Sequence, residues 1–433
     1  MAIAFYFGNQ KKIMISRNYR RAKMKNDFIS RALIISSTRF IALSLPFCDM
    51  IMLGHQGNEY VKNFSVAAQL SQIFVILSIM LSIGINIVIG RTSYQDREKY
   101  IQGTFRYSIY LAISLFIFSL LTAPILHYNM DILKTYLILS ISIFPLCISI
   151  CFSNILETIK LEKKVLIITL YSSIGNLFLN YVLIEWMDNS SIAVSTSTCF
   201  VRLLILFPLF HLFLKEKIKL SPRNVKGLNK ELLVLGRTNA ITSLCFTGGL
   251  SLLVIYISSN METEFSAFFG LTLNFMNTIS VIFVGMTISL TISLSKENNN
   301  ARLVTAGYLK HAFIYILVFS FLFYCITPLL SYAYLGYKNQ LLIKYFMLSI
   351  GVIAFDGIAQ VFIATLRIYG ISQIPPLFRL SLIFIGIPLS FIFSIDSDPI
   401  ANIIKFMMIG NILASIFCIL YFVRYFPKQK TAP

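Results

Sequence analysis

The chain alternates between long apolar runs and short polar connections. Each of twelve runs has about 20 residues or more, which is the length a helix needs to cross the hydrocarbon core of a bilayer. Hydrocarbon offers no partners to backbone groups, so each run must close its own hydrogen bonds as a helix. The pattern predicts helices at residues 32–53, 66–90, 104–126, 134–156, 165–186, 192–214, 238–258, 266–292, 308–331, 341–366, 372–395 and 400–424.

The positive charges of the connections predict the orientation of these helices. With the N-terminus inside the cell, the inner segments hold 27 Lys and Arg, and the outer loops hold four. Such an asymmetry is what the positive-inside rule predicts. We therefore expect a multi-pass protein of the plasma (inner) membrane with a basic tail at residues 1–31, a short tail at 426–433 and both termini in the cytoplasm.

Composition supports a membrane protein and changes the meaning of the net charge. Apolar residues make up 57% of the chain and charged residues 13%, against roughly 45–50% and about 25% in soluble proteins. The formal charge of +19 is accounted for by topology and by contact with the anionic inner leaflet. Binding to nucleic acid is therefore an unnecessary hypothesis.

The longest polar connection divides the chain into two halves. We expect residues 32–214 to form one six-helix bundle, residues 215–237 a cytoplasmic linker, and residues 238–425 a second six-helix bundle. The halves show weak ordered matches, such as Gly84 with Gly285, although chance similarity between apolar helices is common. An even number of spans in each half predicts a pseudo-two-fold axis along the membrane normal.

The cysteines and histidines do not form a recognisable site. All seven cysteines lie in apolar runs without CxxC spacing, and the four histidines lie far apart. Buried thiols explain this pattern better than a metal site or a disulfide framework. We expect no metal and no cofactor.

Asp49 is the clearest candidate for chemistry in the first half. It lies well inside an apolar run, three residues after Pro46, whose missing N–H can bend the helix and free a carbonyl. A carboxylate beside such a bend is suited to hold a cation or a proton. The alternative is a buried acid that is paired with Arg39 or Arg202, and Arg202 itself is expected to form a structural ion pair within its own half.

Several polar side chains of the first half accompany this acid. Asn176 and Asn180 are four residues apart on one helical face, and the sixth span opens with hydroxyls that include Thr196. Such groups supply oxygens for a monovalent ion, but they also join membrane helices to one another. Their spacing alone leaves both interpretations open.

In the second half, Asp356 is the corresponding deep acid, and Gln360 follows it by one helical turn. It has a similar alternative as a buried structural acid. Glu157 and Glu185 lie at predicted helix ends, where we expect solvated or headgroup-level positions.

Several of these segments resemble the multidrug and toxic compound extrusion (MATE) family of cation-coupled efflux antiporters. Residues 47–57, FCDMIMLGHQG, resemble the family pattern of Asp, apolar residues and two glycines. Asn176 and Asn180 fall where NorM-like members carry paired Asn. The segments FDGIAQVFIATLRIYG (355–370) and FIGIPLSF (384–391) resemble further family stretches in the correct order.

The resemblance implies an antiporter that exports organic cations in exchange for H⁺ or Na⁺ by alternating access. It assigns Asp49, Asn176, Asn180 and Thr196 to ion coupling, makes Asp356 a second-half candidate, and places Pro46, Arg202 and Gln360 in the structure or the substrate cleft. We expect a monomer in the bilayer without enzymatic activity, because acid/base or metal groups are not gathered as an enzyme requires.

The sequence also departs from the family. NorM-like members carry a Glu in the seventh span that joins the tenth-span Asp, whereas this chain has no acid there and places Phe246 near that position. Arg367 is followed by Ile368, where the family usually has Gly. The alternative function is a flippase of lipid-linked oligosaccharides from the same superfamily, which a cavity dominated by Arg39, Arg106 and Arg202 would favour.

Overall fold

The computed structural model of the protein describes most of the predicted spans. The described residues are 28–41, 45–93, 95–127, 129–219, 221–260, 263–295, 301–380, 385, 389 and 398–425. Nearly all of the predicted N-terminal tail, the C-terminal tail and most of the eleventh span, including the FIGIPLSF segment apart from residues 385 and 389, lie outside them.

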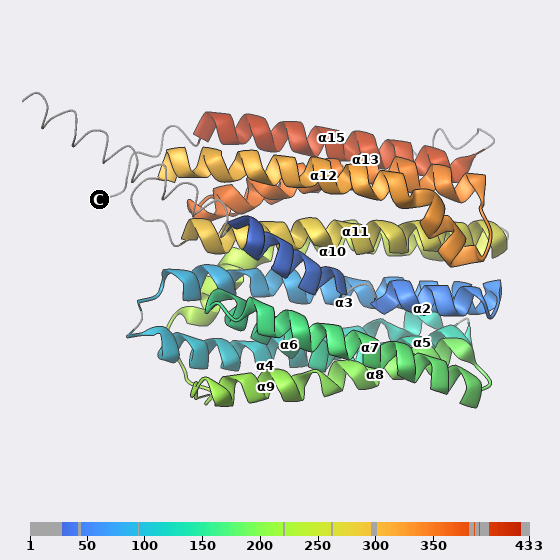
Figure 1. The fold of residues 1–433 in the computed structure, drawn as a ribbon, viewed down its shortest axis with the longest axis horizontal. Coiled ribbons are helices and arrows are strands. Elements are labelled where there is room, and N and C mark those ends of the chain that lie inside the picture. The colour runs from blue at the N-terminus through green and yellow to red at the C-terminus, as the bar shows by residue number, and fades with distance from the viewer. Residues whose placement is uncertain are drawn as a thin grey trace, which may run out of the picture.

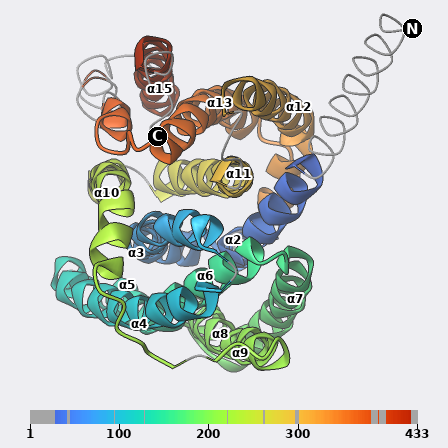
Figure 2. The same cartoon turned by 90° about the vertical axis from the view of Figure 1, so that its left-hand side faces the viewer.

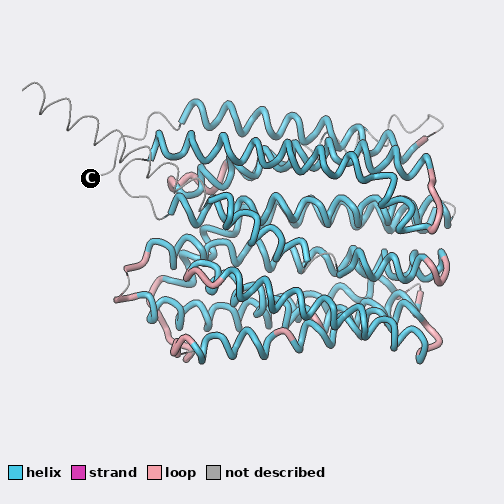
Figure 3. The backbone as a smooth tube through the Cα atoms, viewed as in Figure 1, coloured by secondary structure: helices cyan, strands magenta, loops and turns pink. Residues whose placement is uncertain are grey.

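Within the described ranges the protein consists of helices joined by short loops (Figure 3). The first helix covers residues 28–41. It is followed by α2 (Leu45–Gly54), α3 (Asn58–Arg91), α4 (Arg97–Thr122), η1 (Ala123–Leu126), α5 (Met130–Ile141), α6 (Ile143–Thr158), α7 (Glu162–Trp186), α8 (Ser190–Leu204), α9 (Leu206–Lys215), α10 (Leu228–Asn260), α11 (Thr263–Ser295), α12 (Ala301–Leu335), α13 (Gln340–Ile368), η2 (Pro375–Leu380) and α15 (Pro399–Tyr425).

Ten continuous helical stretches of the described chain are long and apolar enough to cross a membrane. They correspond to ten of the twelve predicted spans. The first predicted span is divided between helix 28–41 and α2, and the eleventh lies mostly outside the described residues. The predicted all-α fold of twelve transmembrane helices in two bundles is confirmed.

Local sequence explains where several helices begin. Asn129, Asn189 and Asn339 precede α5, α8 and α13, and the side-chain oxygen of each accepts hydrogen bonds from the backbone N–H groups of the second and third residues of its helix. This capping satisfies donors that have no partner inside the helix. The outer faces of the helices carry large apolar side chains such as Phe118 and Phe321, which are 59% and 67% exposed, as a surface that contacts lipid requires.

The two halves of the chain lie side by side. In Figure 2, which views the helices nearly end-on, α4 to α9 lie on one side and α12, α13 and α15 on the other. Between them, α3 and α11 are adjacent and are the most deeply buried of the ten apolar stretches. The interface between the halves therefore centres on α3, which packs against both α10 and α11 of the other half.

Two glycines that match in the sequence repeat occupy matching positions in this interface. A Cβ added to Gly84 of α3 would lie 3.1 Å from the carbonyl oxygen of Leu232 on α10, and one added to Gly285 of α11 would lie 2.5 Å from Cα of Ser36 in helix 28–41. The second span thus crosses the seventh as the eighth crosses the first. This correspondence is what a two-fold relation between the halves requires.

The molecule has two ends that differ in charge. We call the end that holds the connections 92–96, 159–161 and 216–227 the basic end, and the opposite one the far end. In Figure 1 the helix that begins at residue 28 and the end of α15 both lie at the basic end. The first and last described residues are therefore on the same side of the molecule, as an even number of spans requires.

Candidate functional site

Asp49 is fully buried on α2 and is held by side chains from two other helices. Its Oδ1 atom accepts hydrogen bonds from Nδ2 of Asn176 at 3.0 Å and Nδ2 of Asn180 at 2.6 Å, both on α7. Its Oδ2 atom accepts a hydrogen bond from the hydroxyl of Thr198 on α8 at 3.0 Å. The spacing of four residues on α7 places both amides on one face, as the sequence predicted.

Thr196 does not take part in this cluster. Its hydroxyl donates to the carbonyl of Ile192, one turn earlier on its own helix, at 2.9 Å. Thr198 takes the place that the sequence-based interpretation gave to Thr196, because two residues along a helix rotate a side chain by about 200°. The expected set is therefore corrected from Thr196 to Thr198.

Ser197 is a supporting residue that sequence reasoning missed. Its hydroxyl lies 3.1 Å from Oδ1 of Asn176 and donates to it. This bond fixes the amide so that its NH₂ group points at Asp49. The sequence shows the run of four hydroxyl residues at 195–198. It does not show which of these side chains faces α7.

The cluster offers both donors and a free oxygen. Oδ1 of Asn180 is buried and has no hydrogen-bond partner among the described residues. An amide presents either an oxygen or an NH₂ group. The same side chains can therefore stabilise an ionised carboxylate by donation, or present oxygens to a cation beside it.

Pro46 lies where the first span is divided. It is the second residue of α2, a position at which the missing N–H costs no helical hydrogen bond, and α2 runs in a different direction from helix 28–41 (Figure 1). The change of direction agrees with the expected bend, and residues 42–44, between helix 28–41 and α2, lie outside the described part.

Asp49 faces a cavity between the two halves. The Asp49 cavity is lined from the first half by Pro46, Asp49, Gln69 and Arg202 and from the second half by Asn274 and Asn277, among others. Its lining is rich in amides and hydroxyls. An ion at Asp49 would therefore lie at the boundary that a transporter of two bundles must open and close.

Arg202 lies in the wall of this cavity, and its positive charge interacts with Asp49 without forming a direct ion pair. It is 7% exposed, and Nη1 donates to the hydroxyl of Ser142 at 2.7 Å. No ion pair joins it to an acid in the described residues. The expected ion pair within its own half is therefore not formed.

In the second half, Asp356 forms an ion pair with Arg379, which the sequence analysis did not identify as its partner. Nε and Nη2 of Arg379, from η2, both lie 2.8 Å from Oδ1 of Asp356. Gln360 donates its side-chain amide to Oδ2 of Asp356. The guanidinium carbon of Arg379 lies 5.8 Å from the ring centre of Phe246, as in a cation–π contact. Asp356 thus has its own counter-charge.

These residues line a second cavity between the halves. The central cavity is bordered by Asp356, Gln360 and Arg379 at its polar side and by apolar side chains such as Ile79, Phe246 and Leu250 elsewhere. It encloses about 760 Å³, its open mouth included. The cavity is apolar over most of its wall.

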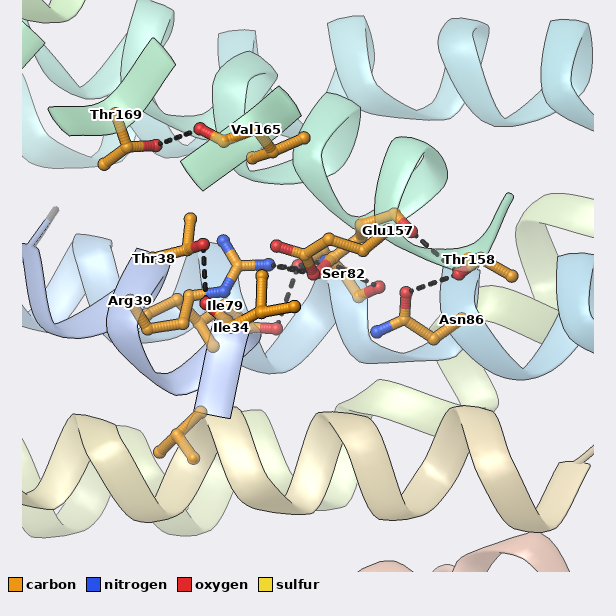
Figure 4. A network of polar contacts seen from close by, with 12 residues as sticks. Ile34, Thr38, Arg39, Ile79, Ser82, Asn86, Glu157, Thr158, Val165 and Thr169 are labelled. Atoms are coloured by element: carbon orange, nitrogen blue, oxygen red, sulfur yellow. Dashed lines mark hydrogen bonds and ion pairs between the residues drawn. The ribbon is translucent and has the colours of Figure 1, made fainter. Parts of the chain in front are cut away.

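Glu157 contradicts its expected headgroup-level position. It is fully buried, and its Oε2 lies 2.8 Å from Nη2 of Arg39 (Figure 4). The same guanidinium donates to Oδ1 of Asn154, whose Nδ2 donates to the hydroxyl of Ser82. Arg39 is therefore the partner of Glu157 and not of Asp49, which lies in the same half without an ion pair to any described residue.

Comparison with known proteins gives one sequence match and several structural ones. Residues 35–182 match the family model MatE. No curated protein matches the chain significantly. The sequence match therefore covers the first five predicted spans, including Asp49, Asn176 and Asn180.

The fold is similar to those of solved transporters. The eukaryotic MATE transporter AtDTX14 is 12% identical, with a TM-score of 0.77 over 93% of this chain and 96% of that one. An outward-facing multidrug resistance MATE family transporter of the MOP superfamily is 16% identical, with a TM-score of 0.78 over 94% and 97%. A MOP superfamily transporter from Pyrococcus furiosus, described as having a binding pocket of reverse polarity, is 15% identical, with a TM-score of 0.77 over 94% and 97%. At these identities the structures establish the shared fold.

Proposed function

The chain is a MATE family transporter, and from this premise we propose that it is a secondary antiporter that exports small organic molecules in exchange for H⁺ or Na⁺. The ion enters at Asp49. The protein lies in the plasma membrane with the basic end in the cytoplasm, and it alternates between openings to the two sides.

The observation that carries the proposal is the environment of Asp49. Its carboxylate is fully buried, its hydrogen-bond donors are neutral, and it forms no ion pair with any described residue. A charge at membrane depth costs several kcal/mol unless it is neutralised. Arg202 in the wall of the same cavity interacts with Asp49 without forming a direct ion pair. A proton or a sodium ion completes the neutralisation, and the opening and closing of the neighbouring cavity changes how easily the ion enters.

The short helix α2 connects ion binding with contact between the halves. Asp49 lies in the middle of α2, and Gly54 at its far end lies against α12 of the other half, where an added Cβ would be 2.7 Å from the carbonyl oxygen of Tyr334. A change in the hydrogen bonds of Asp49 that shifts α2 therefore alters this contact. This movement of α2 couples the ion to transport only if the ion binds the conformations open to the two sides of the membrane with different affinity.

The substrate class rests on the family resemblance and on the central cavity. An organic cation is the first class to test. Among the described acids that line the Asp49 and central cavities, Asp356 is paired with Arg379, and Asp49 is assigned to the ion. Recognition in the central cavity would therefore depend mainly on the aromatic and apolar wall around Phe246.

The flippase alternative has less support. A pyrophosphate would be received by several cations in one cleft, but Arg39 is paired with Glu157, and Nε of Arg106 donates to Tyr110 on an exposed face. Of the three arginines that would favour a flippase, Arg202 alone lines the Asp49 cavity. Arg39 and Arg202 do line one smaller cavity together, but Arg106 does not line it, and the charge of Arg39 is matched by Glu157.

The test is ethidium transport in proteoliposomes with separately imposed Na⁺ and proton gradients. Asp49→Asn keeps the size of the side chain and removes its charge, so we expect it to abolish gradient-driven transport. Asp188→Asn, an exposed acid between α7 and α8, is the matched control and should transport normally. Undiminished gradient-driven transport by Asp49→Asn would overturn the proposal, as would lipid scrambling in the absence of any gradient-driven transport.

A further inference from the structure

A third cavity between the halves lies toward the basic end. The Arg367 cavity is lined by Asn86 of α3, Asn239 of α10, Thr287 and Thr291 of α11, and Gln360 and Arg367 of α13, among others. It encloses about 440 Å³, its open mouth included. Both halves therefore contribute polar groups to one space.

Arg367 brings an unmatched positive charge to this cavity. It is the second-last residue of α13 and is 3% exposed. No hydrogen bond or ion pair joins its guanidinium to a described residue, and its Nε is buried without a partner. A buried guanidinium without a counter-charge is costly, so the position calls for an anion.

Asn86 presents a second unfilled donor from the opposite half. It is fully buried, and its Oδ1 accepts a hydrogen bond from the hydroxyl of Thr158 at 3.0 Å. This bond fixes the orientation of the amide, and the Nδ2 atom is left without a partner among the described residues. An amide donor and a guanidinium fork suit the two oxygens of one oxyanion.

The remaining lining groups do not neutralise Arg367. None of the residues that line this cavity is an acid. Arg379 also lines it, but its charge is matched by Asp356. Thr287 and Thr291 donate their hydroxyls to carbonyls of their own helix. The cavity therefore holds one uncompensated positive charge.

The Arg367 cavity adjoins the central cavity. Met80, Val284, Gln360 and Arg379 line both. The shared wall places the mainly apolar space of the central cavity next to the guanidinium. A molecule with an anionic head and an apolar body fits both spaces at once.

We propose that the Arg367 cavity binds the oxyanion head, a carboxylate or a phosphate, of an amphipathic molecule whose apolar body occupies the central cavity. The inference rests on the proposed transport function and adds an amphipathic anion, as a second substrate class, to the organic cation proposed above. Arg367 supplies the charge and Asn86 the second donor. Because the two residues come from different halves, a separation of the halves at the basic end would divide the site.

The test is direct binding to the full-length protein in phosphatidylcholine nanodiscs, without any ion gradient. The probe is dansylglycine, which has one carboxylate on an aromatic body, and its matched neutral control is dansylglycinamide. We expect the protein to bind dansylglycine at least about tenfold more tightly than the amide. Arg367→Gln should abolish that preference, Arg367→Lys should retain part of it, and Asn86→Leu should reduce it.

Arg424→Gln removes the same charge from an exposed position near the end of α15, so it should keep the preference for dansylglycine. Equal binding of the two probes by the unmodified protein, or a preference that survives Arg367→Gln, would overturn the proposal. If thermal unfolding shows that Arg367→Gln does not fold, Asn86→Leu becomes the deciding variant. An unchanged preference for dansylglycine in Asn86→Leu would then overturn the proposal.

A second arm identifies the source of the oxyanion. Phosphatidylglycerol added to the nanodiscs competes with dansylglycine if the head of an anionic lipid occupies the site, and it does not compete if the ligand enters as a soluble molecule. Both results support an oxyanion site, provided that binding depends on Arg367. Since binding is measured without a gradient, its failure is distinguishable from a failure of ion coupling at Asp49.

Discussion

The hydroxyl of Thr198 donates to Oδ2 of Asp49 at 3.0 Å, across 149 positions of the chain. The bond joins α8 to α2 and completes a set of three donors around one buried carboxylate. It also distinguishes Thr198 from Thr196, whose hydroxyl is used within its own helix.

Thr198→Val should change the apparent affinity for the coupling ion. A hydrogen bond to a charged group contributes about 1.5–3 kcal/mol, and its loss disfavours the ionised carboxylate. The proton concentration that gives half-maximal exchange should therefore fall about tenfold or more, whereas the corresponding Na⁺ concentration should rise. Transport assays at graded pH and Na⁺ measure this. An equal effect of Thr196→Val would contradict the assignment.

The buried pair of Arg39 and Glu157 should contribute strongly to stability. Arg39→Gln leaves a fully buried carboxylate without its counter-charge, which costs about 3–5 kcal/mol. The double variant Arg39→Gln/Glu157→Gln should lose less than the sum of the two single variants. Unfolding in detergent measures these differences.

The control for that pair is Lys164 with Glu216, which lie 2.7 Å apart but are 44% and 34% exposed. Lys164→Gln should cost less than about 1 kcal/mol, because exposed ion pairs contribute little. If Arg39→Gln and Lys164→Gln lower the free energy of unfolding equally, the prediction that the buried ion pair contributes more to stability is wrong.

Two glycine substitutions should shift the conformational equilibrium in opposite directions. Gly285→Ala would place a methyl group 2.5 Å from the Ser36 backbone toward the basic end, and Gly54→Ala would place one 2.7 Å from the Tyr334 backbone at the far end. Overpacking of this kind costs about 1–3 kcal/mol, which separation of the halves at that end relieves.

Distances between spin labels would measure the shift in a variant without native cysteines. Labels at Lys163 and Arg424 report on the basic end, and labels at Glu185 and Tyr337 report on the far end. Gly285→Ala should lengthen the first distance and Gly54→Ala the second. Gly175→Ala, which would meet nothing within 4 Å, should change neither.

Asp398 should give a pH-dependent contribution to stability at the far end. Burial opposes its ionisation, but the Lys344 ammonium, the Ala401 N–H and the Tyr345 hydroxyl outweigh it, so its pKa is lowered. A lowered pKa stabilises the fold above the unfolded value of about 3.9, and this contribution is lost as pH falls below about 4.

Thermal unfolding of the protein and of Asp398→Asn, followed between pH 3 and pH 7, measures that contribution. The difference between the two should be largest near neutral pH and should shrink below about pH 4. Asp188→Asn is the control, since no hydrogen bond of its side chain occurs among the described residues. A difference that is constant with pH would contradict the prediction.

The sequence predicted the deep acids more reliably than their partners. Helical spacing placed Asn176 and Asn180 on one face, and the family resemblance joined them to Asp49. Thr198, the pairing of Arg39 with Glu157 and the pairing of Asp356 with Arg379 were missed. Each of these depends on the rotation and axial offset of helices that are distant in the chain, and no local pattern encodes either quantity.

The division of the first span shows the same limit at a smaller scale. Pro46 signalled a bend, and helix 28–41 and α2 run in different directions. A proline indicates that a helix changes direction near it, but the new direction depends on how α2 packs between the two halves.

The sequence by itself determined that the protein is a bundle of membrane-spanning helices, because the cost of an unsatisfied backbone group in hydrocarbon acts on every long apolar run separately. It also gave a resemblance to a family, through short motifs that lie within single spans, and residues 35–182 match the MatE family model. Only the tertiary structure decided which polar groups meet. Asp49 has neutral donors, Asp356 has Arg379, and Arg367 has no partner in the described residues, because burial and pairing belong to the space between helices and not to any one of them.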